Sequence, residues 1–127
     1  MEAKTLEFVF PTHTNHLGTL FGGTLVAWMD KAAAFAAIRC AQSTVVTVSV
    51  EDIEFKTPIK QGEMVELVAR VDRVGRTSLR TRVEVYREDP MRAHRELCTT
   101  GYFTLVALDG DGKPKPVPPE HASASSS

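Results

Sequence analysis

Residues 24–40 are apolar on nearly every side of a helix, and they constrain the fold more than any other stretch. This pattern predicts a buried core helix rather than a surface one. The helix nevertheless carries an acid, Asp30. At about 100° per residue, the bulky side chains point away from Asp30 and the residues within about 60° of it are small. The bulky set is Leu25, Trp28, Met29 and Phe35, and the small set is Gly23, Val26, Ala27, Ala33, Ala34 and Ala37.

A carboxylate framed by small side chains leaves room for another group to approach it. Because burying an unpaired carboxylate is costly, Asp30 should have a partner or a chemical task. The helix alone leaves two structural alternatives open. The acid could be solvated near the start of the helix, where the macrodipole favours it, or paired with a basic residue of another element.

Composition excludes several classes of protein. A chain of 127 residues predicts one domain, and 43% hydrophobic with 24% charged residues is typical of a soluble globular protein. The formal net charge of −1 gives no footprint for nucleic acid or an anionic membrane. No basic stretch followed by an apolar one begins the chain, so we expect no signal peptide, and residues 24–40 are too short to span a bilayer.

The two cysteines, Cys40 and Cys98, have neither metal-ligand nor redox spacing. They are interpreted as reduced core thiols of a cytoplasmic protein. The sequence contains no Cys/His cluster, so we expect no metal and no cofactor.

The other regular elements are predicted to be strands, at residues 4–10, 44–55, 64–74, 77–87 and 96–108. Pro11 ends the first strand, and a loop then precedes the helix. Gly75-Arg76 is a hairpin signal between the third and fourth strands. In 44–55, the apolar phase runs through Val46, Val48 and Val50 and then switches to Ile53 and Phe55, which predicts a bulge near Glu51-Asp52.

This order predicts an α+β domain in which a long antiparallel five-stranded sheet curls around one central helix. We expect the domain to cover residues 1–119 and the Ser-rich residues 120–127 to form a disordered tail. One helix cannot cover so long a sheet, and edge strands need protection. Pairing with a second copy would provide it, so we expect at least a homodimer.

One run of residues, from Thr14 through Gly23 (TNHLGTLFGG) and then Trp28-Met29-Asp30, resembles the signature of the hot-dog-fold acyl-CoA thioesterases. The similar group comprises the YciA-like bacterial enzymes and the brain-type cytosolic acyl-CoA hydrolases. The resemblance covers roughly residues 8–119. It continues in order through residues 45–48, 55–59, Gly62, 75–78 and 103–107.

The resemblance implies a hot-dog domain whose active sites lie at dimer interfaces, often in a trimer of dimers. Asp30 matches the catalytic carboxylate of this family. Asn15 matches the asparagine that completes the site from the neighbouring subunit, although an Asx-turn that stabilises the loop is an alternative. Gly22 and Gly23 stand where the helix begins, so their amides could face a ligand, or they could simply form a tight turn.

The resemblance also places the loop Gly75-Arg76-Thr77-Ser78 against the CoA phosphates, a role that suits a guanidinium and hydroxyl donors. The alternative is an ordinary hairpin turn with an exposed arginine. His13 and His16 match no essential position of the family, and both are interpreted as solvated loop residues.

The predicted reaction is hydrolysis of an acyl-CoA thioester to a free acid and CoA. The Gly22 or Gly23 amides would stabilise the oxyanion, Asp30 would act as general base or as nucleophile, and Asn15 would orient the water or the carbonyl. A first alternative is an enoyl-thioester hydratase or dehydratase of the same fold, which resembles a pattern with Asp and His close together in a loop. A second is a non-catalytic acyl-CoA sensor, which usually adds a DNA-binding domain for which this chain has neither length nor charge.

Overall fold

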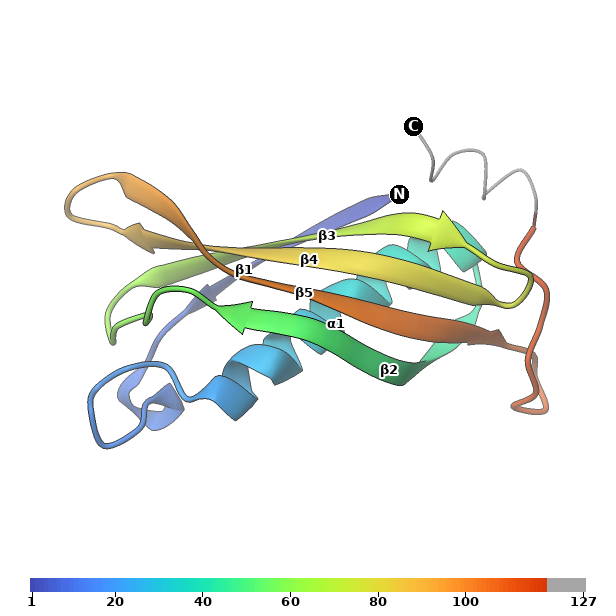
Figure 1. The fold of residues 1–127 in the computed structure, drawn as a ribbon, viewed down its shortest axis with the longest axis horizontal. Coiled ribbons are helices and arrows are strands. Elements are labelled where there is room, and N and C mark those ends of the chain that lie inside the picture. Colours follow the sequence, from blue (N-terminus) through green and yellow to red (C-terminus); the bar gives the residue numbers. More distant parts are fainter. Residues whose placement is uncertain (119–127) are drawn as a thin grey trace.

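The computed structural model describes residues 1–118, which form one antiparallel sheet and one long helix (Figure 1). The predicted tail, residues 120–127, lies outside the described residues. The elements in chain order are β1 (Glu2–Phe8), η1 (Pro11–His13), α1 (Gly22–Ala41), β2 (Thr44–Phe55), β3 (Met64–Val74), β4 (Ser78–Asp89) and β5 (His94–Leu108).

The strand order is β1-β3-β4-β5-β2, with every neighbouring pair antiparallel, so β1 and β2 are the two edges. The helix lies across one face of this sheet (Figure 1). Alternating side chains of the three central strands point toward it and form the core, which includes Val65, Leu67, Leu79, Val83, Val85, Phe103 and Leu105. The predicted α+β arrangement of one helix and five strands is therefore confirmed.

The helix is buried on one side only. Leu25, Trp28 and Met29 face the sheet, whereas Phe35 and Ile38 are 44% and 42% exposed. The prediction of burial on nearly every side is thus wrong for this single chain, because only one layer of sheet is present to cover the helix. The helix also begins at Gly22, two residues earlier than predicted.

Strand β2 contains two irregularities where one was predicted. The bulge near Glu51 and Asp52 is confirmed by a register shift and by the left-handed backbone of Asp52, with φ of 53°. A second shift, between Thr47 and Ser49, was not predicted. Val46 and Val48 are 44% and 57% exposed, so the even-numbered valines do not face the core.

The remaining boundaries differ by a few residues. Strand β1 begins and ends two residues earlier than predicted, and the β4–β5 hairpin continues pairing as far as Asp89 and His94. Gly101 of β5 has a packing role. A Cβ there would lie 3.0 Å from both Met29 Cε and Ile53 Cγ1, so glycine allows the helix to approach the sheet closely.

Candidate active site

Asp30 is partly buried and receives a hydrogen bond from a strand. The Thr47 hydroxyl of β2 donates to Asp30 Oδ1 at 2.6 Å. Asp30 forms no ion pair within residues 1–118, and the adjacent Lys31 pairs with Glu7 at 2.7 Å instead. The alternative of a basic partner is therefore not found in this part of the chain. This carboxylate has no counter-charge among the described residues. Its second oxygen, Oδ2, therefore stays available for chemistry.

Thr47 is the residue that sequence reasoning missed. Its β-branched neighbours made it look like an ordinary strand residue, and the apolar phase was assigned to the even-numbered valines. In the observed register Thr47 pairs with Leu105, a buried residue, so it faces the helix. A polar residue in the helix-facing phase, opposite a helix that carries an acid, is the signal that could have identified it.

Asn15 lies in the loop before the helix and organises that loop. Its Oδ1 accepts hydrogen bonds from the Leu17 amide at 2.9 Å, the Thr19 amide at 3.2 Å and the Thr19 hydroxyl at 3.1 Å. The loop-stabilising alternative is thus correct for this oxygen. The side-chain amide nitrogen donates no hydrogen bond within the described residues, so the same residue can still offer a donor to a ligand.

The loop is tied to the helix start by backbone hydrogen bonds from Phe21 to His13 and from Leu20 to Ile59. Phe21 caps the helix without a side-chain hydrogen bond. The first amides of a helix have no intrahelical acceptor, and the helix macrodipole makes this end attractive to negative charge. Gly22 and Gly23 supply these amides at an exposed position, which suits a developing oxyanion.

A cavity of about 210 Å³ opens beside Gly22. Its walls are mainly apolar and come from the loop before α1, from α1, from the end of β2 and from the loop after β2: Leu20, Leu25, Phe55, Pro58 and Ile59. A thioester carbonyl held at the Gly22 amide would have this cavity next to it.

One chain does not bring all of these groups together. Gly22 and Asp30 are eight residues apart on the same helix, which separates them by about 12 Å along its axis. A reacting carbonyl carbon needs both an oxyanion donor and a base or nucleophile within about 3 Å. The Gly22 amide and the Asp30 carboxylate of one chain therefore cannot act on the same thioester.

The hairpin Gly75-Arg76-Thr77-Ser78 lies at the opposite end of the molecule from the start of α1 (Figure 1). The Gly75 amide donates to the Ser78 carbonyl at 2.8 Å and closes the turn. A Cβ at Gly75 would lie 2.6 Å from Ser78 Oγ, so a side chain there would require the Ser78 hydroxyl to rotate away. The Val117 amide donates to the Arg76 carbonyl, while the Arg76 side chain is exposed and makes no hydrogen bond or ion pair among residues 1–118.

The two loop histidines differ. His16 is exposed, as predicted. His13 is partly buried in the 3-10 turn: its Nδ1 accepts a hydrogen bond from the Phe10 amide at 3.1 Å, and its ring packs edge-on against Trp28 at 5.1 Å. The prediction that His13 is merely solvated is therefore wrong, because this turn folds the ring back onto the helix.

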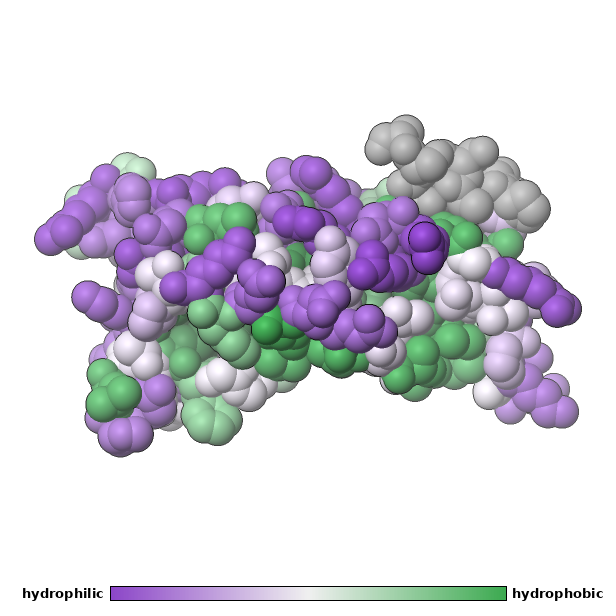
Figure 2. All heavy atoms as spheres, in the orientation of Figure 1, coloured by the Kyte–Doolittle hydropathy of each residue, from purple (hydrophilic) through white to green (hydrophobic). Residues whose placement is uncertain are grey.

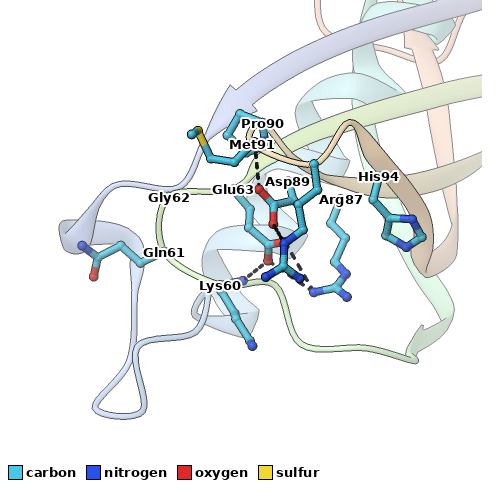
Figure 3. A pocket seen from close by; sticks show the side chains of 10 residues that line it. Lys60, Gln61, Gly62, Glu63, Arg87, Asp89, Pro90, Met91 and His94 are labelled. Atoms are coloured by element: carbon cyan, nitrogen blue, oxygen red, sulfur yellow. Dashed lines mark hydrogen bonds and ion pairs between the residues drawn. The ribbon is translucent and has the colours of Figure 1, made fainter.

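A larger cavity, of about 390 Å³, lies under the β4–β5 hairpin and contains none of the predicted site residues (Figure 3). Four of its charged side chains form ion pairs. Arg87 lies 3.4 Å from Glu63 and 3.0 Å from Glu96, and Arg92 lies 3.6 Å from Asp89. Lys60, which also lines the cavity, forms no ion pair among residues 1–118, so the lining carries more cationic side chains than carboxylates.

Other chemistries find little support in the described residues. No group of three or more His, Cys, Asp or Glu side chains in residues 1–118 is placed to hold a metal. Cys98 is buried, and burial raises the pKa of its thiol, which disfavours the nucleophilic thiolate. No helix in the same residues is long and apolar enough to cross a membrane.

Comparison with known families identifies the class. The family model of the thioesterase superfamily matches residues 17–94 of this chain, which include the helix, Asp30 and the start of β5. The chain belongs to the thioesterase superfamily, and its fold is the predicted hot-dog fold.

Particular relatives narrow the comparison. The chain is 43% identical over 110 residues to the Bacillus subtilis "uncharacterized acyl-CoA thioester hydrolase YkhA", covering 87% of this chain and 64% of that protein. It thus spans somewhat less than two thirds of that relative. A Staphylococcus aureus acyl-CoA hydrolase, solved with butyryl coenzyme A and coenzyme A, is 40% identical with a TM-score of 0.88, covering 92% of this chain and 71% of that one.

Two further structural comparisons bear on the site and the assembly. A hexameric acyl-CoA thioesterase is 41% identical with a TM-score of 0.89, covering 92% of this chain and 75% of that one. Structures of the Staphylococcus aureus enzyme also include separate variants in which an aspartate, an asparagine or a threonine is replaced by alanine.

Proposed function

We propose that the protein hydrolyses acyl-CoA thioesters to a free carboxylic acid and CoA. The observation that carries this proposal is the Asp30 carboxylate, which has a hydroxyl partner at 2.6 Å and no counter-charge within the described residues. Family membership and the names of the relatives support the same substrate class. The replacement of aspartate, asparagine and threonine in the Staphylococcus aureus enzyme involves the same residue types as Asp30, Asn15 and Thr47.

In the proposed reaction the thioester carbonyl oxygen accepts hydrogen bonds from the Gly22 or Gly23 amide. As the carbonyl carbon becomes tetrahedral, its oxygen gains negative charge, which the helix N-terminus stabilises. Asp30 either takes a proton from the attacking water or attacks the carbon itself to form an anhydride. The C–S bond then breaks, and CoA leaves as a thiol.

We infer that two chains build each site, with Asn15 and Gly22 from one chain and Asp30 and Thr47 from the other. The 12 Å separation within one helix, estimated from its rise per residue, requires such an arrangement if both groups act. Edge strand β2 offers the contact, since Val46, Val48 and Val50 are 44%, 57% and 45% exposed. Figure 2 shows apolar surface along this side of the molecule. The hairpin at Arg76 lies at the far end of its own chain from the start of α1, so we propose that it contacts the CoA of a site whose helix start comes from the partner.

A trimer of such dimers is the proposed assembly, in line with the hexameric relative. A trimer of dimers needs a second contact surface on each chain. The other edge strand supplies an apolar row, because Leu6, Phe8 and Phe10 are 63%, 40% and 53% exposed. We place the assembly in the cytoplasm, where buried thiols such as Cys98 stay reduced.

Thiol release from acyl-CoA by the purified protein tests the function, with crotonyl-CoA as a second substrate. The proposal expects free CoA from saturated acyl-CoA. Hydration of crotonyl-CoA without thiol release would instead establish a hydratase, and binding without turnover would establish a sensor. In a single turnover in heavy-oxygen water, a label that enters Asp30 would identify the nucleophilic route, since a general base takes up no oxygen.

A further inference from the structure

Two phenylalanines stand beside the start of α1 with nearly equal exposure but different surroundings. Phe21 is 56% exposed and Phe55 is 57% exposed. The Phe21 ring folds over Gly23, where a Cβ would come within 2.9 Å of it, and Phe21 does not line the 210 Å³ cavity. The Phe55 ring lies 3.9 Å from the Cβ position of Gly22 and forms part of the cavity wall.

Apart from the exposed Pro58, the rest of the apolar wall belongs to the core. Leu20, Leu25 and Ile59 are 8%, 4% and 3% exposed, so they are fixed by packing on their far sides. Phe55 is the last residue of β2, where the strand gives way to the 56–63 loop. It is therefore the one large wall residue whose ring can be shortened without opening a hole in the core of the described chain.

We propose that Phe55 bounds the acyl pocket beside Gly22 and makes the enzyme favour short acyl chains over long ones. This inference rests on the proposed function, because it takes the Gly22 amide as the carbonyl site. The first carbons of an acyl chain bound there enter about 210 Å³ of mainly apolar space, and the exposed Phe55 ring stands at its edge.

The expected sensitivity to chain length is large. In a hydrophobic pocket, one methylene too many or too few changes kcat/KM by about 10–200-fold. The wild-type protein should therefore have a higher kcat/KM on butyryl-CoA than on dodecanoyl-CoA. Replacing the Phe55 ring with a methyl group opens the wall toward solvent and gives a longer chain a path.

The test compares Phe55→Ala with Phe21→Ala in the intact assembly, using thiol release from straight-chain acyl-CoA of two to sixteen carbons. For Phe55→Ala, the ratio of kcat/KM on dodecanoyl-CoA to that on butyryl-CoA should rise at least tenfold, as expected for one pocket methylene. Phe21→Ala should leave this ratio at the wild-type value, since its ring covers Gly23 and lines no part of the cavity.

An unchanged ratio in Phe55→Ala, or an equal change in both variants, would overturn the assignment. If Phe55→Ala does not fold, as judged by circular dichroism and size, Phe55→Leu takes its place and must still raise the ratio, by a smaller factor. Failure of the proposed function has a different signature, because the wild-type protein would then release no thiol from any acyl-CoA.

Discussion

The two halves of the candidate site differ in how the chain holds them. Asp30 and Thr47 lie seventeen positions apart in sequence and meet only because β2 packs beside α1. Asn15 is instead fixed by residues within four positions of itself, through the Leu17 amide and both donors of Thr19. One half depends on tertiary packing and the other on local loop chemistry.

Each half is held in place by its own hydrogen bonds, but each lacks one group that catalysis needs. The Asp30 half has a carboxylate and a hydroxyl but no oxyanion donor nearby, whereas the loop half has the Gly22 and Gly23 amides but no base. Preorganised groups are effective only when both surround the same reacting atom. The halves are suited to meeting across a two-fold interface, and the following experiments test that division.

Asp30→Asn should have the largest effect, because it keeps the side-chain shape and removes the base or nucleophile from its half of the site. We expect kcat to fall about 10²–10⁴-fold. The fold should be unaffected, since an amide can still accept the hydrogen bond from Thr47. Thiol-release kinetics with a thermal melt as control measure both quantities, and retention of most of the rate would end the catalytic role of Asp30.

Mixing two inactive variants tests whether the halves belong to different chains. Asn15→Ala and Asp30→Asn should each be nearly inactive as homodimers. In a mixed dimer, one shared site carries both lesions and the other carries none, so random reassortment should restore roughly a quarter of the sites. Co-refolding followed by thiol-release assay gives the result.

Native mass spectrometry of the refolded sample provides the control, because it counts the mixed dimers directly. If each site lay within one chain, every site would keep one lesion whatever the mixing. Mixed dimers that are present by mass and show no recovered activity would exclude the two-chain site.

Thr47→Val tests the half of the site that contains Asp30, and we expect a smaller effect than from Asp30→Asn. The substitution keeps the shape of the side chain and removes the hydroxyl that donates to Asp30 at 2.6 Å. A hydrogen bond to a charged group contributes about 1.5–3 kcal/mol, so we expect kcat to fall about 10–100-fold through poorer positioning of the carboxylate. KM should change little.

A matched control is Thr104→Val on β5, a partly buried threonine that makes no hydrogen bond to Asp30. It should leave kcat near the wild-type value. A positioning role also predicts that Thr47→Val adds almost nothing in the Asp30→Asn background, because the two residues act as a unit. Fully additive losses would show that Thr47 acts separately from Asp30.

The same division explains what could be predicted from sequence. The long apolar stretch predicts the helix, and alternation with turn signals predicts the five strands, since these are local patterns. Asp30 stood out because an acid is rare on an apolar helix. The partner Thr47 did not, because alternation alone does not say which face of a strand turns inward, and here the odd-numbered residues are the less exposed ones. Irregularity at an edge strand follows from packing rather than from alternation.

His13 shows a second limit on what can be predicted from the sequence. Its sequence context is a loop, yet its ring packs on Trp28 because the Pro11–His13 turn reverses the chain. The Asx geometry of Asn15 was foreseen as an alternative, since asparagine bonds its own backbone locally. Contacts within a few residues are thus readable from sequence, while contacts between elements require the register.

Arg76→Ala should have the smallest effect, because its exposed guanidinium lies far from the reacting carbonyl in its own chain. The hairpin is closed by backbone hydrogen bonds, from Gly75 to Ser78 and from Val117 to Arg76, which the substitution keeps. A solvent-exposed charged contact contributes roughly 0.5–1 kcal/mol, so KM for acyl-CoA should rise about two- to fivefold with kcat unchanged.

A thioester that lacks the nucleotide makes the Arg76 experiment decisive. If the guanidinium binds a CoA phosphate, Arg76→Ala should not affect the KM of an acyl-pantetheine, which has no such phosphate to contact. Arg73→Ala is the matched control, since Arg73 is also exposed and forms no ion pair among residues 1–118. Equal losses on both substrates would mean that Arg76 only maintains the hairpin, and the phosphate site would then have to lie elsewhere on the paired chains.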